Sequence, residues 1–185
     1  MHGSFLSLHR RSIRLEGFDY SRSGWYFVTI CCDRQVVRSG GFPFRGSSGP
    51  FGTIRRQTIS LSGLGAMVRR EWQRLGNRFV WAEMDDVVVM PDHLHGLIYI
   101  VDGDVSDGVG GRPPNVCGRS VPKLIQAFKS TTTWRAKREF GVAAAAGARL
   151  WQRNYYESII RNQRHLAAVR RYIVDNPARM AVSAP

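Results

Sequence analysis

The stretch "VVVMPDHLHGLIYIV", residues 87–101, limits the possible fold more than any other part of the chain. Two apolar, β-branched runs flank the short connection "PDH", so the stretch predicts two neighbouring strands joined by a tight turn that contains the proline. His93 and His95 stand where the second run begins. Side chains two residues apart in a strand project from the same face, so both imidazoles can point at one location.

Two nitrogen ligands at this spacing are the start of a divalent-metal site. The competing interpretation is that one or both histidines are buried and hydrogen-bonded without a metal. No third strong ligand is visible nearby, because Asp92 would face away if the strand alternation reached it. Gly96 follows the pair, and its missing side chain could let a nucleic-acid backbone approach. The histidines alone leave both interpretations open.

Hydrophobic periodicity and turn residues divide the rest of the chain into further elements. Strands are expected over 25–32, 80–90 and 93–101, with a short one within 150–161; helices are expected over 61–75, 120–141 and 163–177. Ser120 and Gly141 suit the two ends of the second helix, and Asn176–Pro177 suits the end of the third. The order predicts an α+β, ferredoxin-like split βαβ fold: an antiparallel sheet with helices on one face.

We expect residues 1–185 to form a single domain. Three segments have little apolar content or low sequence complexity and are expected to be flexible: 38–52, 102–118 and 142–149. The ferredoxin-like fold hosts many functions, so the function must be argued from the site.

The charge balance favours an anionic partner. Lysine and arginine number 27 against 14 acidic residues, giving a formal net charge of +13. Such an excess attracts phosphate-rich polymers or anionic membrane surfaces. No apolar stretch approaches the ~20 residues of a membrane span, and no secretory apolar block is visible. Nucleic acid is therefore the favoured partner over a merely basic surface.

The last predicted helix carries an apolar stripe of Leu166, Val169 and Ile173, which would pack on the sheet. Tyr172 lies beside this stripe, and Asn176 follows one turn later on the same face. By propensity alone, core packing is the better explanation of a tyrosine at this position. A phenol near a metal-bound phosphate would instead be a nucleophile that needs nearby positive charge to ionise, and an amide oxygen suits a hard cation.

Candidate DNA contacts come from two basic regions. The second predicted helix mixes lysines and arginines with aromatic residues, the components of a single-strand binding surface, and we expect Lys129 and Arg135 to contact DNA. Near the N-terminus, Arg10, Arg11 and Arg14 could lie along a DNA hairpin. A solvated charged face and a frayed basic terminus are the respective alternatives.

Several ordered blocks resemble one family. "MPDHLHG" followed far along the chain by "YIVDNP" resembles the single-tyrosine HUH transposases of insertion sequences, where HUH means histidine–bulky hydrophobic–histidine. More narrowly, the chain resembles the REP-associated tyrosine transposases. "HRRSIRLEGFDYSRSGWYFVTICC", "LIQAFKSTTT" and "LWQRNYYESIIRNQRHL" extend the resemblance over nearly the whole chain.

The resemblance implies a role for each candidate residue. His93, His95 and Asn176 would hold Mg²⁺ or Mn²⁺, and Tyr172 would attack a phosphate of single-stranded or hairpin DNA. The product would be a 5′-phosphotyrosine link and a free 3′-hydroxyl, without an external energy source. Tyr155 and Tyr156 are rival nucleophiles from a different sequence block. The family also implies a monomer or a homodimer, and a bacterial cytoplasmic location in which the protein is associated with the nucleoid through DNA.

The sequence hypothesis is thus a metal-dependent DNA endonuclease and strand-transferase of the transposase type. Its main rival is a ferredoxin-like nucleic-acid-binding protein without catalytic activity. A zinc hydrolase is a third and weaker alternative, because the sequence shows neither a third strong ligand nor a water-activating carboxylate motif.

Overall fold

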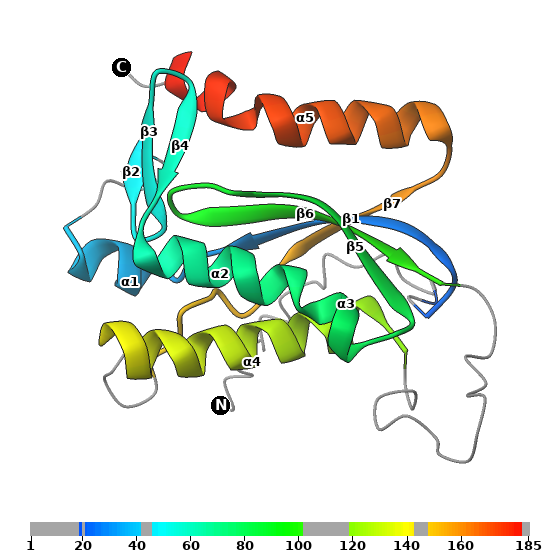
Figure 1. Cartoon of the computed structure of the whole chain (residues 1–185), viewed down its shortest axis with the longest axis horizontal. Helices are drawn as coiled ribbons and strands as arrows, with labels where there is room; N and C mark the ends of the chain where they lie inside the picture. The colour runs from blue at the N-terminus through cyan, green and yellow to red at the C-terminus, as the bar shows by residue number, and fades with distance from the viewer. Residues whose placement is uncertain (1–18, 20, 42–45, 102–118, 143–147, 183–185) are drawn as a thin grey trace, which may run out of the picture.

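Four strands form the central antiparallel sheet in the order Ala82–Val89 (β5), His93–Ile100 (β6), Gly24–Cys31 (β1) and Tyr156–Ile160 (β7) (Figure 1). This computed structural model describes residues 19, 21–41, 46–101, 119–142 and 148–182. Both β1 and β5 are antiparallel to β6, which lies between them, so β1 and β5 run parallel as in a split βαβ unit. The predicted α+β ferredoxin-like fold is confirmed.

Helices cover both faces of this sheet. Gly63–Gln73 (α2) and Val121–Phe140 (α4) pack side by side on one face, and Gln163–Val182 (α5) crosses the other (Figure 1). The two helices of the split motif therefore share one face, as expected. The final helix adds a third layer on the opposite face.

Alternate side chains of β1 contribute to two hydrophobic cores. Tyr26, Val28 and Ile30 are buried in the larger core, which α2 and α4 cover. Trp25 and Phe27 face the other way and pack against the smaller core beneath α5. That smaller core consists of Leu97, Ile160, Leu166, Val169 and Ile173. The apolar stripe predicted for the last helix is thus what attaches α5 to the sheet, each buried side chain stabilising it by about 1.5–3 kcal/mol.

Both predicted ends of α4 are confirmed. Ser120 Oγ accepts a hydrogen bond from the backbone N–H of Lys123 at 3.4 Å. Gly141 follows the last residue of the helix with a φ of 65°, a left-handed conformation that favours glycine.

A second, small sheet was not predicted from the sequence. Its strands pair in the order Ser48–Gly49 (β2), Gly52–Arg55 (β3) and Thr58–Leu61 (β4), and a short helix, Arg34–Ser39 (α1), precedes it. The turn between β3 and β4 has positive φ at Arg56 (47°) and Gln57 (66°), as in a type I′ hairpin turn. Such turns usually contain Asn or Gly, so "RQ" carried no turn signal. The loop expected over 38–52 therefore includes a strand.

Two helix ends differ from expectation. The last helix was expected to stop near Asn176 but continues through Pro177 to Val182. Proline removes one backbone N–H from the helix, and the burial of Asn176 and Pro177 against the fold offsets that loss. The helix expected over 61–75 ends at Gln73, and Leu75–Arg78 (α3) forms a separate short helix.

Several expectations fall outside the described residues. These are the segment 102–118, residues 143–147 of the segment 142–149, and the arginines Arg10, Arg11 and Arg14. Within the ranges that are described, no helix combines the length and apolar character needed to cross a bilayer.

Candidate active site

The turn between β5 and β6 is fixed by backbone hydrogen bonds on several sides. The N–H of Met90 donates to the carbonyl of His93 at 2.8 Å, which closes the turn. Cys32 N–H donates to the carbonyl of Asp92 at 2.7 Å, and Phe51 N–H donates to that of Pro91 at 3.0 Å. The unpredicted small sheet thus supports the start of β6, where the histidines lie.

The structure brings the two histidines together as their spacing predicts. His93 and His95 project from the α5 side of β6, and their Nε2 atoms lie 3.1 Å apart. Leu94 between them points into the opposite core and is fully buried. The two rings are nearly perpendicular, with an interplanar angle of 77°.

Each histidine is oriented through its other ring nitrogen. His93 Nδ1 lies 2.7 Å from a carboxylate oxygen of Asp92, and His95 Nδ1 lies 2.8 Å from the hydroxyl of Thr29 on β1. Asp92 is itself buried. Asp92 was expected to face away only if strand alternation reached it, but β6 begins at His93, so Asp92 belongs to the turn and its carboxylate contacts His93. A carboxylate or hydroxyl at Nδ1 fixes the ring so that Nε2 points into the site.

His95 is held as a neutral imidazole. Burial beneath α5 lowers its pKa to about 3, and the neighbouring His93 acts in the same direction. Desolvation disfavours the charged form of a base, so the ring carries no charge at neutral pH. A neutral imidazole with an available ring nitrogen is the form that binds metal ions.

Tyr172 on α5 lies directly beside this pair. The centroid of its ring is 5.3 Å from that of His95 and 5.9 Å from that of Phe27. The guanidinium of Arg179 lies 5.9 Å from the centroid of the same phenol ring. A phenol, two imidazoles and a cation therefore meet on one face of the sheet, although they come from distant parts of the chain.

The opposite flank of α5 is tied to β5. Arg170 forms an ion pair with Asp85, and a longer one at 4.0 Å with Asp86. Arg170 and Tyr172 are about 200° apart around the helix axis, so the phenol projects from the other flank. Asn176, one turn after Tyr172, is buried. Across the described ranges, no group of three or more His, Cys, Asp or Glu side chains is arranged to hold a metal ion.

Gly96 has a packing role on the other side of the sheet. A Cβ atom at this position would lie 2.3 Å from the Trp72 ring of α2. The small residue is therefore required by a buried indole, and the expectation that it admits a nucleic-acid backbone is wrong.

The two predicted DNA contacts on α4 form their bonds within the protein. Lys129 Nζ donates to the carbonyls of Gln152, Arg153 and Asn154 at 2.9, 3.3 and 3.0 Å. Arg135 pairs with Glu71 at 2.6 Å and with Glu139 at 2.7 Å. Both side chains thus hold neighbouring parts of the protein in place. A charge pattern in the sequence does not distinguish this structural role from contact with DNA.

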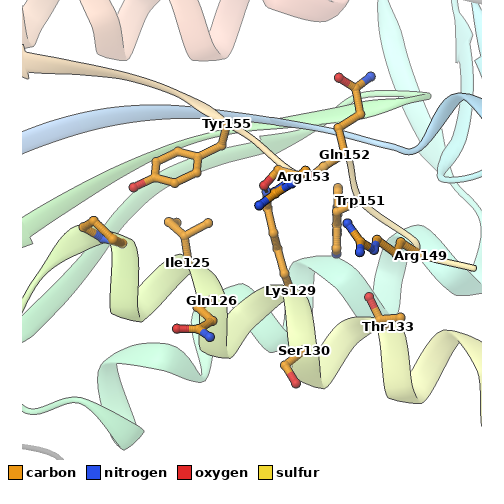
Figure 2. Close-up of a pocket in the computed structure, with 11 residues that line it drawn as sticks. Ile125, Gln126, Lys129, Ser130, Thr133, Arg149, Trp151, Gln152, Arg153 and Tyr155 are labelled. Atoms are coloured by element: carbon orange, nitrogen blue, oxygen red, sulfur yellow. Dashed lines mark hydrogen bonds between the residues drawn. The ribbon is translucent and has the colours of Figure 1, made fainter. Parts of the chain in front are cut away.

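Lys129 lies in a pocket of about 710 Å³ between α4 and the segment before β7 (Figure 2). Ile125, Trp151 and Tyr155 contribute apolar walls, while Arg149 and Arg153 contribute cations. An adjoining pocket of about 610 Å³ also includes both arginines and adds Arg34. Arg34, Arg149 and Arg153 were not singled out from the sequence, because they lie outside the helices that the sequence predicted.

The two rival tyrosines point to opposite faces of the sheet. Tyr155 is buried on the α4 side, where Lys129 Nζ lies 5.4 Å from the centroid of its ring. Tyr156 pairs with Thr29 and so projects toward α5, on the same face as His95. Tyr156 is 60% exposed.

Comparisons with known proteins bear on the family and on the fold. The sequence model of the family described as "Transposase IS200 like" matches residues 115–176, which include Tyr172 and Asn176 but not the histidines. An uncharacterised protein of Haemophilus influenzae is 34% identical over 179 residues, covering 91% of this chain and 88% of that protein. The fold resembles a REP-associated tyrosine transposase bound to a REP hairpin, with a TM-score of 0.57, 17% identity, and coverage of 90% of this chain and 73% of that one. This chain is thus similar to the IS200-like transposases over residues 115–176, and it shares the fold of a REP-associated tyrosine transposase.

Proposed function

We propose that the protein is a metal-dependent single-strand DNA endonuclease and strand-transferase that acts through Tyr172. The observation that carries this proposal is the contact between the Tyr172 and His95 rings, whose centroids are 5.3 Å apart. If Tyr172 only packed against the smaller core, no pair of convergent imidazoles would be needed beside its ring. A nucleophilic phenol would need a nearby centre that binds and polarises a phosphate.

The residues present fit a divalent cation. Ligand atoms at about 2.1 Å from an octahedral cation lie roughly 3.0 Å from one another, close to the spacing of the two Nε2 atoms. In this structure that spacing is 3.1 Å. Thr29 can donate to or accept from His95 Nδ1, so it tolerates the tautomer that leaves Nε2 available. Asn176 would add an amide oxygen, and a bound Mg²⁺ or Mn²⁺ would polarise the scissile phosphate.

Cleavage would exchange one phosphodiester bond for another. The Tyr172 oxygen forms a bond to phosphorus, the bond from phosphorus to the 3′ oxygen breaks, and the departing 3′ oxygen takes up a proton in place of the one lost by the phenol. The guanidinium of Arg179, 5.9 Å from the centroid of the phenol ring, would stabilise the anionic transition state. Attack by a 3′-hydroxyl on the 5′-phosphotyrosine reverses the exchange and joins strands.

We propose that the DNA outside the reaction centre contacts the pocket between α4 and the segment before β7. Arg149 and Arg153 line both neighbouring pockets and would bind phosphates. Lys129 would act indirectly, because its three carbonyl bonds hold the segment that carries Arg153. Arg135 would likewise support α4 through Glu71. Arg10, Arg11 and Arg14 would contribute further phosphate contacts.

The proposal is tested with end-labelled hairpin DNA and flanking single strands, incubated with the protein in Mn²⁺ or in EDTA. We expect a covalent protein–DNA band on denaturing gels in Mn²⁺ that is absent with EDTA and absent with Tyr172→Phe. A nucleic-acid-binding protein without catalysis would shift the same DNA on native gels and give no covalent band in any metal. That outcome would overturn the enzymatic assignment.

A further inference from the structure

Tyr156 is an exposed aromatic residue at the edge of the reaction centre. It is the first residue of β7, an edge strand of the main sheet, and 60% of its surface is accessible. Most large apolar side chains that the structure describes are buried, so an exposed phenol ring on this face needs a separate explanation. Among the described residues, neither an aromatic ring nor a cation stacks on it, whereas Tyr155 lies beneath Lys129.

The sheet register places Tyr156 in line with the histidine site. Tyr156 is paired with Thr29, and Thr29 is paired with His95, so the three side chains project from one face. Neighbouring strands lie about 4.8 Å apart, which puts the Cα atoms of Tyr156 and His95 roughly 10 Å from each other. Thr29 bridges part of that distance through its hydrogen bond to His95 Nδ1.

The position of α5 leaves Tyr156 on the accessible side of the site. The helix is tied to β5 through Arg170 and Asp85, and Tyr172 projects from the opposite flank. The distribution of charge also favours DNA on the β7 side of the site. Asp85 and Asp86 lie on β5, at the other edge of the sheet. The exposed residues Arg153 and Arg161 flank β7. A single strand with its phosphate at the histidines would therefore extend past Tyr156.

We propose that Tyr156 is a stacking platform for the nucleobase adjacent to the scissile phosphate. This inference rests on the proposed function, and it makes Tyr156 a positioning residue. Every nucleobase has a π face, so one phenol ring can hold an unpaired base without reading its identity. Stacking fixes the nucleotide beside Tyr172, and the ring, not the hydroxyl, supplies the interaction.

The test compares Tyr156→Ala and Tyr156→Phe in single-turnover cleavage over a range of DNA concentrations. Loss of one base stack predicts a roughly 5- to 150-fold higher half-saturating DNA concentration for Tyr156→Ala, whereas Tyr156→Phe stays within about twofold. Ser158→Ala is the matched control, because Ser158 is exposed on the same strand and face. We expect it to behave as the unmodified protein does.

A binding measurement separates this inference from the proposed chemistry. With EDTA present and Tyr172→Phe as background, 2-aminopurine beside the scissile position should lose fluorescence on binding, through stacking on Tyr156. Tyr156→Ala should abolish that quenching and Tyr156→Phe should retain it. Quenching that is unchanged in Tyr156→Ala would overturn the platform even if cleavage occurs. Loss of the covalent adduct in Tyr156→Phe would instead make Tyr156 the nucleophile and overturn the positioning role.

Discussion

The carboxylate of Asp92 lies 2.7 Å from Nδ1 of His93, and the side chain of Asp92 is buried in the turn that starts β6. A buried carboxylate at this nitrogen directs the Nε2 atom of His93 toward the corresponding atom of His95. The turn thereby orients the ring of His93, and β1 orients the ring of His95 through the hydroxyl of Thr29.

Asp92→Asn should weaken metal binding although Asp92 is not proposed as a ligand. An amide at this position orients the His93 ring less strongly and withdraws the negative charge that makes the imidazole a better donor. We expect the affinity for Mn²⁺ to fall by about 10- to 100-fold, measured by calorimetric titration. Glu83→Gln, which alters an exposed carboxylate on β5, is the control and should leave the affinity unchanged. Equal affinities for Asp92→Asn and the unmodified protein would remove the orienting role.

Thr29→Val tests the second orienting contact at nearly constant volume. Valine cannot hydrogen-bond to His95 Nδ1, so the buried ring loses its partner and its orientation is no longer fixed. The expected loss of Mn²⁺ affinity is again about 10- to 100-fold, and Thr29→Ser should restore most of it. If the Thr29→Val and Thr29→Ser proteins bound Mn²⁺ with equal affinity, the hydroxyl of Thr29 would have no role in the site.

Arg149→Gln combined with Arg153→Gln should weaken DNA binding without reducing the metal affinity. Each phosphate contact in a single strand contributes about 0.7 to the slope of log K against log salt, so the slope should fall by about 1.4. Fluorescence anisotropy at several salt concentrations gives this slope. Arg38→Gln with Arg69→Gln removes two exposed arginines outside both pockets and serves as the control. Identical slopes in the two double variants would argue against the pocket as the DNA surface.

Gly96→Ala should destabilise the fold because its Cβ would meet the Trp72 ring at 2.3 Å. Overpacking of a buried site typically costs about 1–3 kcal/mol, and urea unfolding measures it. Gly76→Ala is the matched substitution, since the nearest atoms to its added Cβ are at 3.6 Å. It should be neutral or stabilising by less than about 1 kcal/mol. Equal stability of the two variants would contradict the packing assigned to Gly96.

Local patterns in the sequence predicted the elements that carry the site. The two-residue spacing of His93 and His95 indicated a shared face, and the stripe of Leu166, Val169 and Ile173 indicated how the tyrosine helix would pack. Capping residues determined both ends of α4. In each case a short-range rule of backbone geometry is sufficient, so no knowledge of the tertiary structure was needed.

Features that depend on long-range pairing could not be predicted in this way. Tyr156, Thr29 and His95 lie in a row across the sheet only because β7, β1 and β6 pair in this register. The contact of Gly96 with Trp72 joins a strand to a helix. The contact of Asp92 with His93 could not be predicted because the turn before β6 interrupts strand alternation. The end predicted for the last helix at Asn176–Pro177 was wrong because burial overrides the local preference.

Mass spectrometry of the covalent adduct tests the central claim most directly. Trypsin cuts after Arg171 and Arg179, so Tyr172 lies in the peptide YIVDNPAR, whereas Tyr155 and Tyr156 share NYYESIIR. After cleavage of hairpin DNA in Mn²⁺ and nuclease digestion, the proposed mechanism predicts a nucleotide attached through a 5′ phosphate to Tyr172 in YIVDNPAR. A nucleotide on NYYESIIR, or strand cleavage without a modified tyrosine in either peptide, would contradict it.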